Sequence, residues 1–258
     1  MKAIIYIIER DFKRFFRYRW WLVGLISMNL ADLFIMALVY TKMVRSEILA
    51  SYFRFFSPGI TITALFAAAF MIGREVNWEV RRDYASYLLS LPIKRWELAF
   101  GRVLSGGLRG MVYMAPLLLT TFVFLGSPTI FQLFIILSAL FLIAIGTSSL
   151  SISIAASITS FEKFVTARGV VYYLLFFCST VFYPINLMEQ LKEQGVLPPF
   201  MVDLARNNPL SCGADLIRSF LLNSPEFTPY LIINLVAYAF IFVVLGALTY
   251  VKMLQRTR

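Results

Sequence analysis

The residues most suggestive of chemistry are 104–107, LSGG, the first four letters of the loop with which one class of ATPases clamps ATP. Such a loop works beside a phosphate-binding loop of the form G-x-x-x-x-G-K-[ST]. Gly101 and Gly106 have the required glycine spacing, but Gly107 and Leu108 follow where Lys and Ser or Thr are needed. The sequence therefore predicts no ATP site in this chain.

The same glycines have a structural explanation. Gly106 and Gly110 form a G-x-x-x-G pattern inside an apolar run, and small residues at this spacing let membrane helices approach closely. We expect both glycines to serve helix packing.

Other catalytic and metal chemistry lacks its usual residues. The chain contains no histidine, which excludes His-ligated metals, haem and Ser–His catalysis. Its two cysteines, Cys178 and Cys212, form no zinc-binding pair. We therefore expect no catalytic residue, no metal site and no cofactor bound by this chain.

The composition is that of an integral membrane protein. Of the 258 residues, 60% are hydrophobic and 15% charged, and the apolar residues fall into long runs. About 20 apolar residues in a helix cross the ~30 Å hydrocarbon layer. Six runs are of this kind: Trp20–Tyr40, Ser57–Gly73, Val103–Leu125, Ile130–Ile158, Phe164–Pro184 and Tyr230–Val251. The predicted fold is an all-α integral membrane domain of six transmembrane helices over residues 1–258.

Two boundaries have local signals. Ser57 and Pro58 suit an N-cap and a first helical position, so the second span is expected to start there. Residues 1–19 are basic and aromatic, with Ile4, Ile8 and Phe12 near helical spacing. This pattern predicts an amphipathic helix in the membrane interface. The alternative is an ordinary basic flank that orients the first span.

The basic residues predict the orientation in the membrane. Of the 24 Lys and Arg, 17 lie in the N-terminal flank, in 74–102, in 157–168 and in the C-terminal tail, and six lie in the opposite connections. By the positive-inside rule both termini are cytoplasmic, in a multi-pass protein of the plasma membrane. The net charge of +10 then reflects topology and anionic lipid rather than a nucleic-acid partner.

The cytoplasmic segment 74–101 carries a second helical pattern. Val76, Val80, Tyr84 and Leu88 recur every four residues and predict one apolar face. Leu91-Pro92 ends this helix, since the residue before a proline is pushed out of the α region, and another begins near 94–97. This pattern is typical of a helix that docks into a soluble partner. The alternative is a solvated helix in the membrane interface.

The outer segment 185–229 is interrupted by prolines and contains one short amphipathic helix. Asn208 can cap it and Pro209 can begin it. Asp215 and Arg218 can pair across one turn. An apolar stripe is formed by Leu210, Ala214, Ile217 and Leu221. We expect a helix that dips into the interface from outside.

Two motifs, LL-x-x-P-I-x-R at 88–95 and N-P-L with A-D-x-I-R at 208–218, together with the six spans, resemble the membrane subunit of ABC-2 type ABC exporters. The resemblance covers the whole chain. It implies a transmembrane dimer, formed with a second copy or a related permease, and a separate ABC ATPase subunit in two copies that binds ATP and Mg²⁺.

The resemblance also assigns residues. Those on the coupling-helix motif are Glu75, Leu88, Leu89, Pro92, Ile93 and Arg95, and Val80 and Tyr84 share the expected docking face. Those on the outer re-entrant motif are Asn208, Pro209, Leu210, Asp215 and Arg218.

Two charged residues lie within predicted spans, where charge is costly and usually functional. Asp32 is in the middle of the first span and either pairs with a basic group on a neighbouring helix or lines a pathway. Arg109 is close to the cytoplasmic end of the third span, and we expect it to extend to the headgroups.

These observations favour an ATP-driven exporter subunit without catalytic residues, which moves a hydrophobic or lipid-like compound such as a drug, lipid or glycolipid. The alternative is a secondary carrier that works without an ATPase and uses Asp32. Such carriers usually show internal repeats, and the two halves of this sequence show none.

Overall fold

A computed structural model describes residues 2–17, 19–43, 52–82, 84–222 and 229–256, and every regular element within these ranges is an α-helix. The helices are α1 (Lys2–Arg17), α2 (Arg19–Met43), α3 (Tyr52–Phe70), α4 (Ile72–Arg81), α5 (Tyr84–Ser90), α6 (Arg95–Leu125), α7 (Ile130–Ser157), α8 (Phe161–Phe177), α9 (Ile185–Glu193), α10 (Pro199–Asn207), α11 (Pro209–Leu221) and α12 (Pro229–Arg256). Residues 1, 18, 83 and 223–228 of the predicted N-terminal, coupling and outer segments lie outside the described residues.

Several helices are long and apolar enough to cross a membrane. Four qualify in the described part of the chain: Tyr52–Arg81, which joins α3 to α4, and α6, α7 and α12. A fifth results if α1 and residues Leu22–Met36, which meet at 73°, are counted as one broken span. The protein is thus a multi-pass membrane protein, and the total of six spans stays a prediction.

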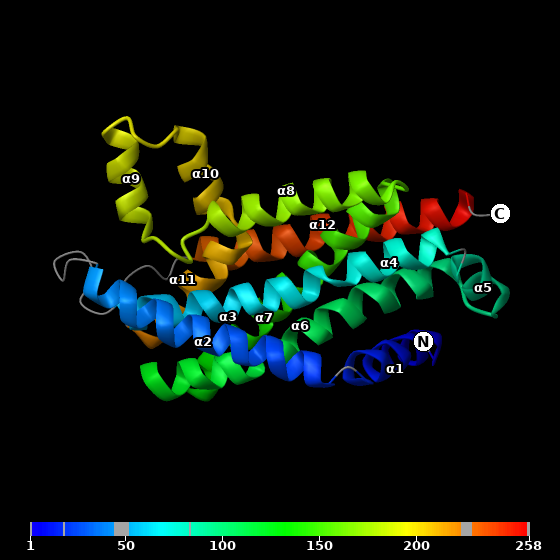
Figure 1. Cartoon of the computed structure of the whole chain (residues 1–258), viewed down its shortest axis with the longest axis horizontal. Coiled ribbons are helices and arrows are strands. Elements are labelled where there is room, and N and C mark those ends of the chain that lie inside the picture. The colour runs from blue at the N-terminus through cyan, green and yellow to red at the C-terminus, as the bar shows by residue number, and fades with distance from the viewer. Residues whose placement is uncertain (1, 18, 44–51, 83, 223–228, 257–258) are drawn as a thin grey trace.

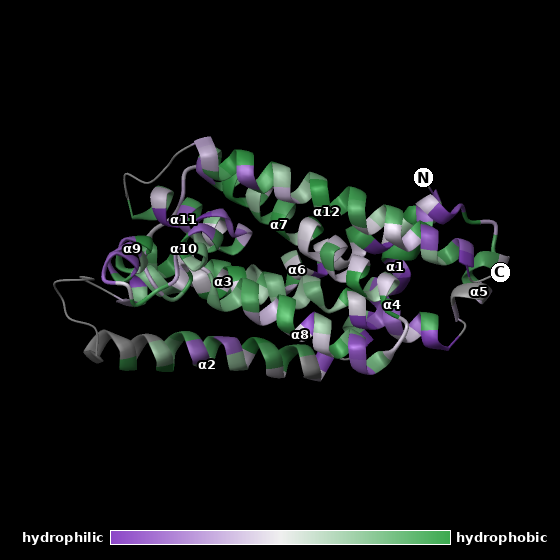
Figure 2. Ribbon diagram, turned by 90° about the horizontal axis from the view of Figure 1, so that it is seen from above, coloured by the Kyte–Doolittle hydropathy of each residue, from purple (hydrophilic) through white to green (hydrophobic). Residues whose placement is uncertain are grey.

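The long helices lie roughly side by side along the longest axis of the molecule (Figure 1). The two termini and α5 lie at one end, and α9 and α10 lie at the other. The middle of the bundle is mostly hydrophobic, and hydrophilic residues gather around α1 and α4 and around α9 (Figure 2). Apolar residues between two polar ends are the pattern expected where the middle of the bundle faces lipid.

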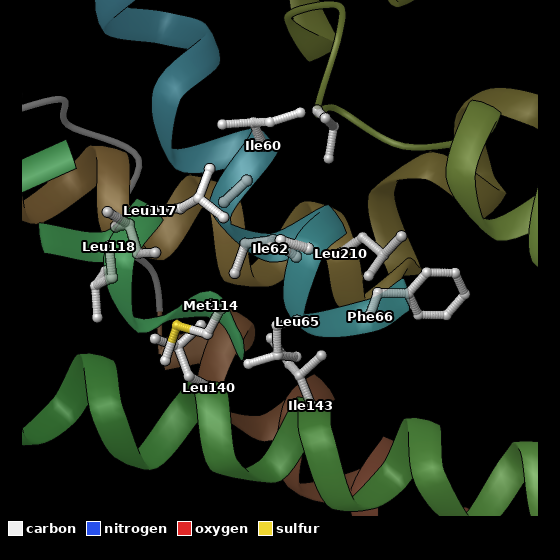
Figure 3. Packing of buried hydrophobic residues seen from close by; sticks show 14 of the residues in the cluster. Ile60, Ile62, Leu65, Phe66, Met114, Leu117, Leu118, Leu140, Ile143 and Leu210 are labelled. Atoms are coloured by element: carbon white, nitrogen blue, oxygen red, sulfur yellow. The ribbon is translucent and has the colours of Figure 1, made fainter. Parts of the chain in front are cut away.

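The core is built around α3. Its side chains are almost all buried, and they meet α6, α7 and α11 in one apolar cluster (Figure 3). Ile62, Leu65 and Phe66 of α3 are fully buried there, beside Leu117 of α6 and Ile143 of α7. Dense side-chain packing of this kind holds helices together in a membrane, because lipid offers no hydrophobic driving force between them.

The predicted start of the second span was wrong. The helix begins at Tyr52, and Pro58 lies inside it. The Ser57 hydroxyl caps nothing, but its carbonyl accepts hydrogen bonds from Thr61 Oγ1 at 3.1 Å and Thr121 Oγ1 at 3.2 Å. Pro58 has no N–H to donate to the Arg54 carbonyl one turn earlier, and membrane helices tolerate such an internal proline.

The predicted single span Phe164–Pro184 was also too long. The helix α8 ends at Phe177, and the chain then turns back towards α11. The amide of Asn208, at the start of α11, donates to the carbonyls of Leu175 at 2.7 Å and Cys178 at 2.6 Å. It thereby satisfies carbonyl groups that the end of a helix leaves without a partner.

Candidate functional site

The coupling segment consists of α4, α5 and the first turns of α6. The chain breaks around Pro92, as the sequence predicts, and α6 begins at Arg95 with Lys94 as its N-cap. The Lys94 amide donates to Glu97 Oε2 at 3.2 Å, the reciprocal contact of a capping box. The cap fixes where the chain leaves the short helix α5 and enters the long helix α6.

Much of the expected docking face packs inside the chain itself. Leu88 is only 4% exposed, in a cluster with Val76 and Leu98. The side chains packed against this cluster include Val80, Leu89 and Ile93. These side chains therefore pack the coupling segment against other helices of the same chain. Other residues of the segment must then face a partner.

The exposed surface of the coupling segment includes several aromatic side chains. Tyr87 is 57% exposed, Trp96 is 45% exposed and Tyr84 is 38% exposed. Pro92 lies between them and is also exposed, while Arg95 is half-buried. Of these residues, the sequence predicts only Tyr84, Pro92 and Arg95 to take part in the contact with a partner. Tyr87 stands one turn after Tyr84, a spacing that could have revealed it.

A buried ion-pair network joins α1, α4 and α6. The Arg102 guanidinium of α6 is completely buried and donates to Asp11 Oδ2 of α1 at 2.7 Å. Its other terminal nitrogen donates to Glu79 of α4, which is 2% exposed. Asp11 lies outside the predicted spans. Burial raises the pKa of its carboxyl, but the neighbouring guanidinium charges, Arg102 first, outweigh burial and lower that pKa.

Arg109 belongs to the same network, so the prediction that it extends to the headgroups was wrong. It is 3% exposed and donates to Glu75 Oε1 at 2.6 Å and to the Asp11 carbonyl at 2.6 Å. Because α1 and α4 bring these acceptors to α6, the guanidinium finds partners inside the protein. Glu75, assigned to the ATPase contact by resemblance, is engaged with Arg109 and lies 3.8 Å from Arg14, and its role in the ATPase contact stays a prediction.

A cavity of about 470 Å³ adjoins this network and contains Asp32 in its wall. From α2 the lining includes Leu25, Met28, Asn29 and Asp32, and from α8 it includes Arg168, Gly169, Tyr172 and Tyr173. From α3, α4 and the residue that links them it includes Ala67, Ala68, Met71, Arg74 and Glu75. Phe15 of α1 and Arg109 and Tyr113 of α6 complete the wall. Each helix thus presents one face to the cavity. The volume is that of a site for a drug-sized ligand.

The outer motif residues meet as predicted at the other end of the molecule. Asn208 Oδ1 accepts from the Leu210 amide at 3.0 Å and caps α11, in which Pro209 takes an early position. Arg218 donates to Asp215 Oδ1 at 2.6 Å and to the carbonyls of Phe55 at 3.0 Å and Thr180 at 2.9 Å. The motif therefore fastens α11 to the start of α3 and to the turn after α8.

The two glycines of the G-x-x-x-G pattern, of which Gly106 is part of LSGG, lie at helix contacts. A Cβ atom at Gly106 would stand 2.2 Å from Ser148 Oγ and 2.9 Å from Ile72 Cβ. At Gly110 it would stand 3.1 Å from the Ala69 side chain. A side chain at Gly106 would force its neighbours to shift, and one at Gly110 would fit only tightly, so helix packing explains both glycines without any nucleotide.

Comparison with known families gives one match. The model of the ABC-2 type transporter family matches residues 2–222, which include the coupling segment, the ion-pair network and the outer motif. No individual curated protein matches the sequence. Because the family match extends over most of the chain, this membrane protein belongs to the ABC-2 type transporter family.

Proposed function

We propose that the chain is the transmembrane subunit of an ATP-driven exporter. Two copies, or one copy and a related permease, form the translocation path, and a separate ABC ATPase in two copies binds ATP and Mg²⁺ at the cytoplasmic side. The basic residues around the termini favour a cytoplasmic location for both ends. The ATPase therefore docks at the end of the molecule that carries α5.

The observation that carries this proposal is the position of the buried ion-pair network. It connects α1, α4 and α6 through Asp11, Glu79 and Arg102, its members Glu75 and Arg109 line the cavity, and α5 follows α4 directly along the chain. Exposed aromatic side chains at an aqueous end of a membrane protein favour a protein partner. A force on α5 would then reach α6 and α1 together, since breaking buried ion pairs is costly.

ATP hydrolysis in the partner would shift the dimer between inward-facing and outward-facing states, because the ATPase binds the two states with different affinity. The cavity wall contains Asp32 beside aromatic and apolar side chains, which suits a hydrophobic or lipid-like cargo. Family membership favours this mechanism over a carrier that uses Asp32 without an ATPase.

The test is to place charge on the exposed aromatic surface. Tyr87→Asp together with Trp96→Asp is expected to release the ATPase during purification, with the chain still folded because both side chains are exposed. Phe200→Asp is the matched control, since Phe200 is 64% exposed on α10 at the opposite end. Full ATPase recovery with the double variant would contradict the docking surface.

A further inference from the structure

The cavity beside the ion-pair network has a polar organisation that identifies a class of ligand. At one end of the cavity lie two arginines, Arg74 of α4 and Arg168 of α8. No acidic side chain forms an ion pair with either of them among the described residues, whereas nearby Arg102 and Arg109 each have a carboxylate partner. Two unneutralised cations on one wall attract an anion.

The two arginines lie at the same level of the bundle. Arg74 lies seven residues before the end of α4 at Arg81. Arg168 lies seven residues after the start of α8 at Phe161. Arg81 lies over the Phe161 ring at 4.5 Å, so these two helix ends are neighbours. At ~1.5 Å per residue the Cα atoms of both arginines are about 10 Å further into the bundle.

The Arg168 side chain is prepared for a ligand. Its guanidinium lies 5.3 Å from the Phe70 ring, and its Nε is buried without a hydrogen-bond partner in the described structure. A buried donor without an acceptor is unfavourable, and a bound oxyanion would supply the acceptor. The Arg74 charge repels that of Arg168, and an anion between them would relieve this repulsion.

Most of the remaining wall is apolar or aromatic, and its polar members are Asn29, Asp32 and the paired Glu75 and Arg109. Following the helices away from the arginines leads to Tyr172 on α8, Tyr113 on α6 and Ala67 on α3. Met28 lies on the facing side of α2. Asp32 is one turn further along α2 and disfavours a second negative group at this end. The cavity thus has a cationic end and an apolar body.

We propose, on the basis of the export function above, that this cavity binds an anionic amphiphile, with its acidic head between Arg74 and Arg168 and its apolar part towards Tyr113. Glu75 does not compete for the head, because Arg109 already neutralises it at 2.6 Å. With the termini on the cytoplasmic side, as proposed above, the arginines lie in the cytoplasmic half of the bundle, and we expect the ligand to enter from the inner leaflet.

The test measures binding to the purified full chain in a neutral maltoside detergent, by calorimetric titration with dodecyl phosphate. Dodecyltrimethylammonium, which has the same tail and the opposite charge, is titrated in parallel. Dodecyl phosphate is expected to bind saturably and the ammonium compound is not. Arg168→Gln and Arg74→Gln should each weaken phosphate binding about tenfold or more, the value of one charge-assisted contact.

The control variants separate charge from folding. Arg168→Lys keeps the charge and should retain part of the affinity, while Arg206→Gln, on the exposed surface of α10, should bind like the wild type. Asp32→Asn should strengthen phosphate binding, because it removes a like charge from the same cavity.

Two results would overturn the proposal: binding of the ammonium compound that is lost in Asp32→Asn, or unchanged phosphate affinity in Arg168→Gln. Because no ATPase takes part in the titration, either result leaves the coupling proposal standing. Conversely, a chain that binds dodecyl phosphate but recruits no ATPase would contradict only the proposed export mechanism.

Discussion

Arg102 and Asp11 form an ion pair of 2.7 Å inside the protein, although 91 residues separate them in the sequence. The pair fastens the N-terminal helix α1 to the third long helix α6, and Glu79 completes it from α4. Burial of all three side chains makes the contact expensive to break, because Asp11 and Glu79 would lose their one fully buried partner and keep the partly exposed Arg10 and Arg14. It is therefore the contact through which we expect movement of the coupling segment to reach the bundle.

Replacement of Arg102 by methionine is expected to destabilise the protein by about 3–5 kcal/mol, since two carboxylates remain buried without it. Thermal unfolding in detergent, followed by size-exclusion chromatography, measures the change. Lys13→Met is the matched control on α1, because Lys13 is 76% exposed and forms a surface ion pair with Glu9. Equal stability of the two variants would show that the buried ion-pair network does not stabilise the fold.

Leu88 and its neighbour Tyr87 are expected to respond in opposite ways to substitution by aspartate. Leu88 is 4% exposed within an apolar cluster, so Leu88→Asp buries a charge and should lower the unfolding temperature of the chain alone. Tyr87 is 57% exposed, so Tyr87→Asp should leave this temperature unchanged. Unfolding measured without any ATPase distinguishes the two, and a stable Leu88→Asp chain would contradict the burial.

Gly106→Ala is expected to destabilise the protein by ~1–3 kcal/mol, because its methyl group overlaps Ser148 and Ile72 in a tightly packed contact. Gly24→Ala on α2 should be neutral or stabilising, since nothing lies within 4 Å of the new methyl group and alanine favours helix. Nucleotide binding to the complex should be unaffected by Gly106→Ala. A specific loss of ATP binding at unchanged stability would restore a nucleotide role for the LSGG stretch.

Cys212 on α11 is expected to resist alkylation in the folded protein. Burial raises the pKa of its thiol to about 11, so the reactive thiolate is a small minority at neutral pH. In a Cys178→Ser background, maleimide labelling should be slow at pH 7, should rise about tenfold per pH unit below this pKa, and should become fast after denaturation in SDS. Rapid labelling of the native chain at pH 7 would contradict the burial of α11.

Local contacts could be predicted from the sequence, and distant ones could not. The Asn208 cap and the Asp215–Arg218 pair each join residues at most three positions apart, and the structure confirms both. The partners of Arg102 and Arg109 come from other helices, so no spacing in the sequence announces them. An arginine near the end of a span looks the same whether it meets lipid headgroups or a buried carboxylate.

The apolar face of the coupling segment had a similar ambiguity. An apolar residue every four positions identifies a helix face but not what that face packs against. Leu88 packs into an apolar cluster of the chain itself. Asp32 could be recognised as unusual from its position in an apolar run. Its place in a cavity that also contains Arg74 and Arg168 depends on the arrangement of α2, α4 and α8. The coupling and pathway roles of these residues stay predictions.

The most direct measurement is to extract the protein gently from its native membranes, purify it through this chain, and identify what accompanies it. We predict a stoichiometric soluble subunit with a phosphate-binding loop and its own LSGGQ sequence, lost from the Tyr87→Asp, Trp96→Asp variant and retained in Phe200→Asp. A chain that purifies without any ATPase, and recruits none on reconstitution, would contradict the export mechanism and favour a carrier that works through Asp32.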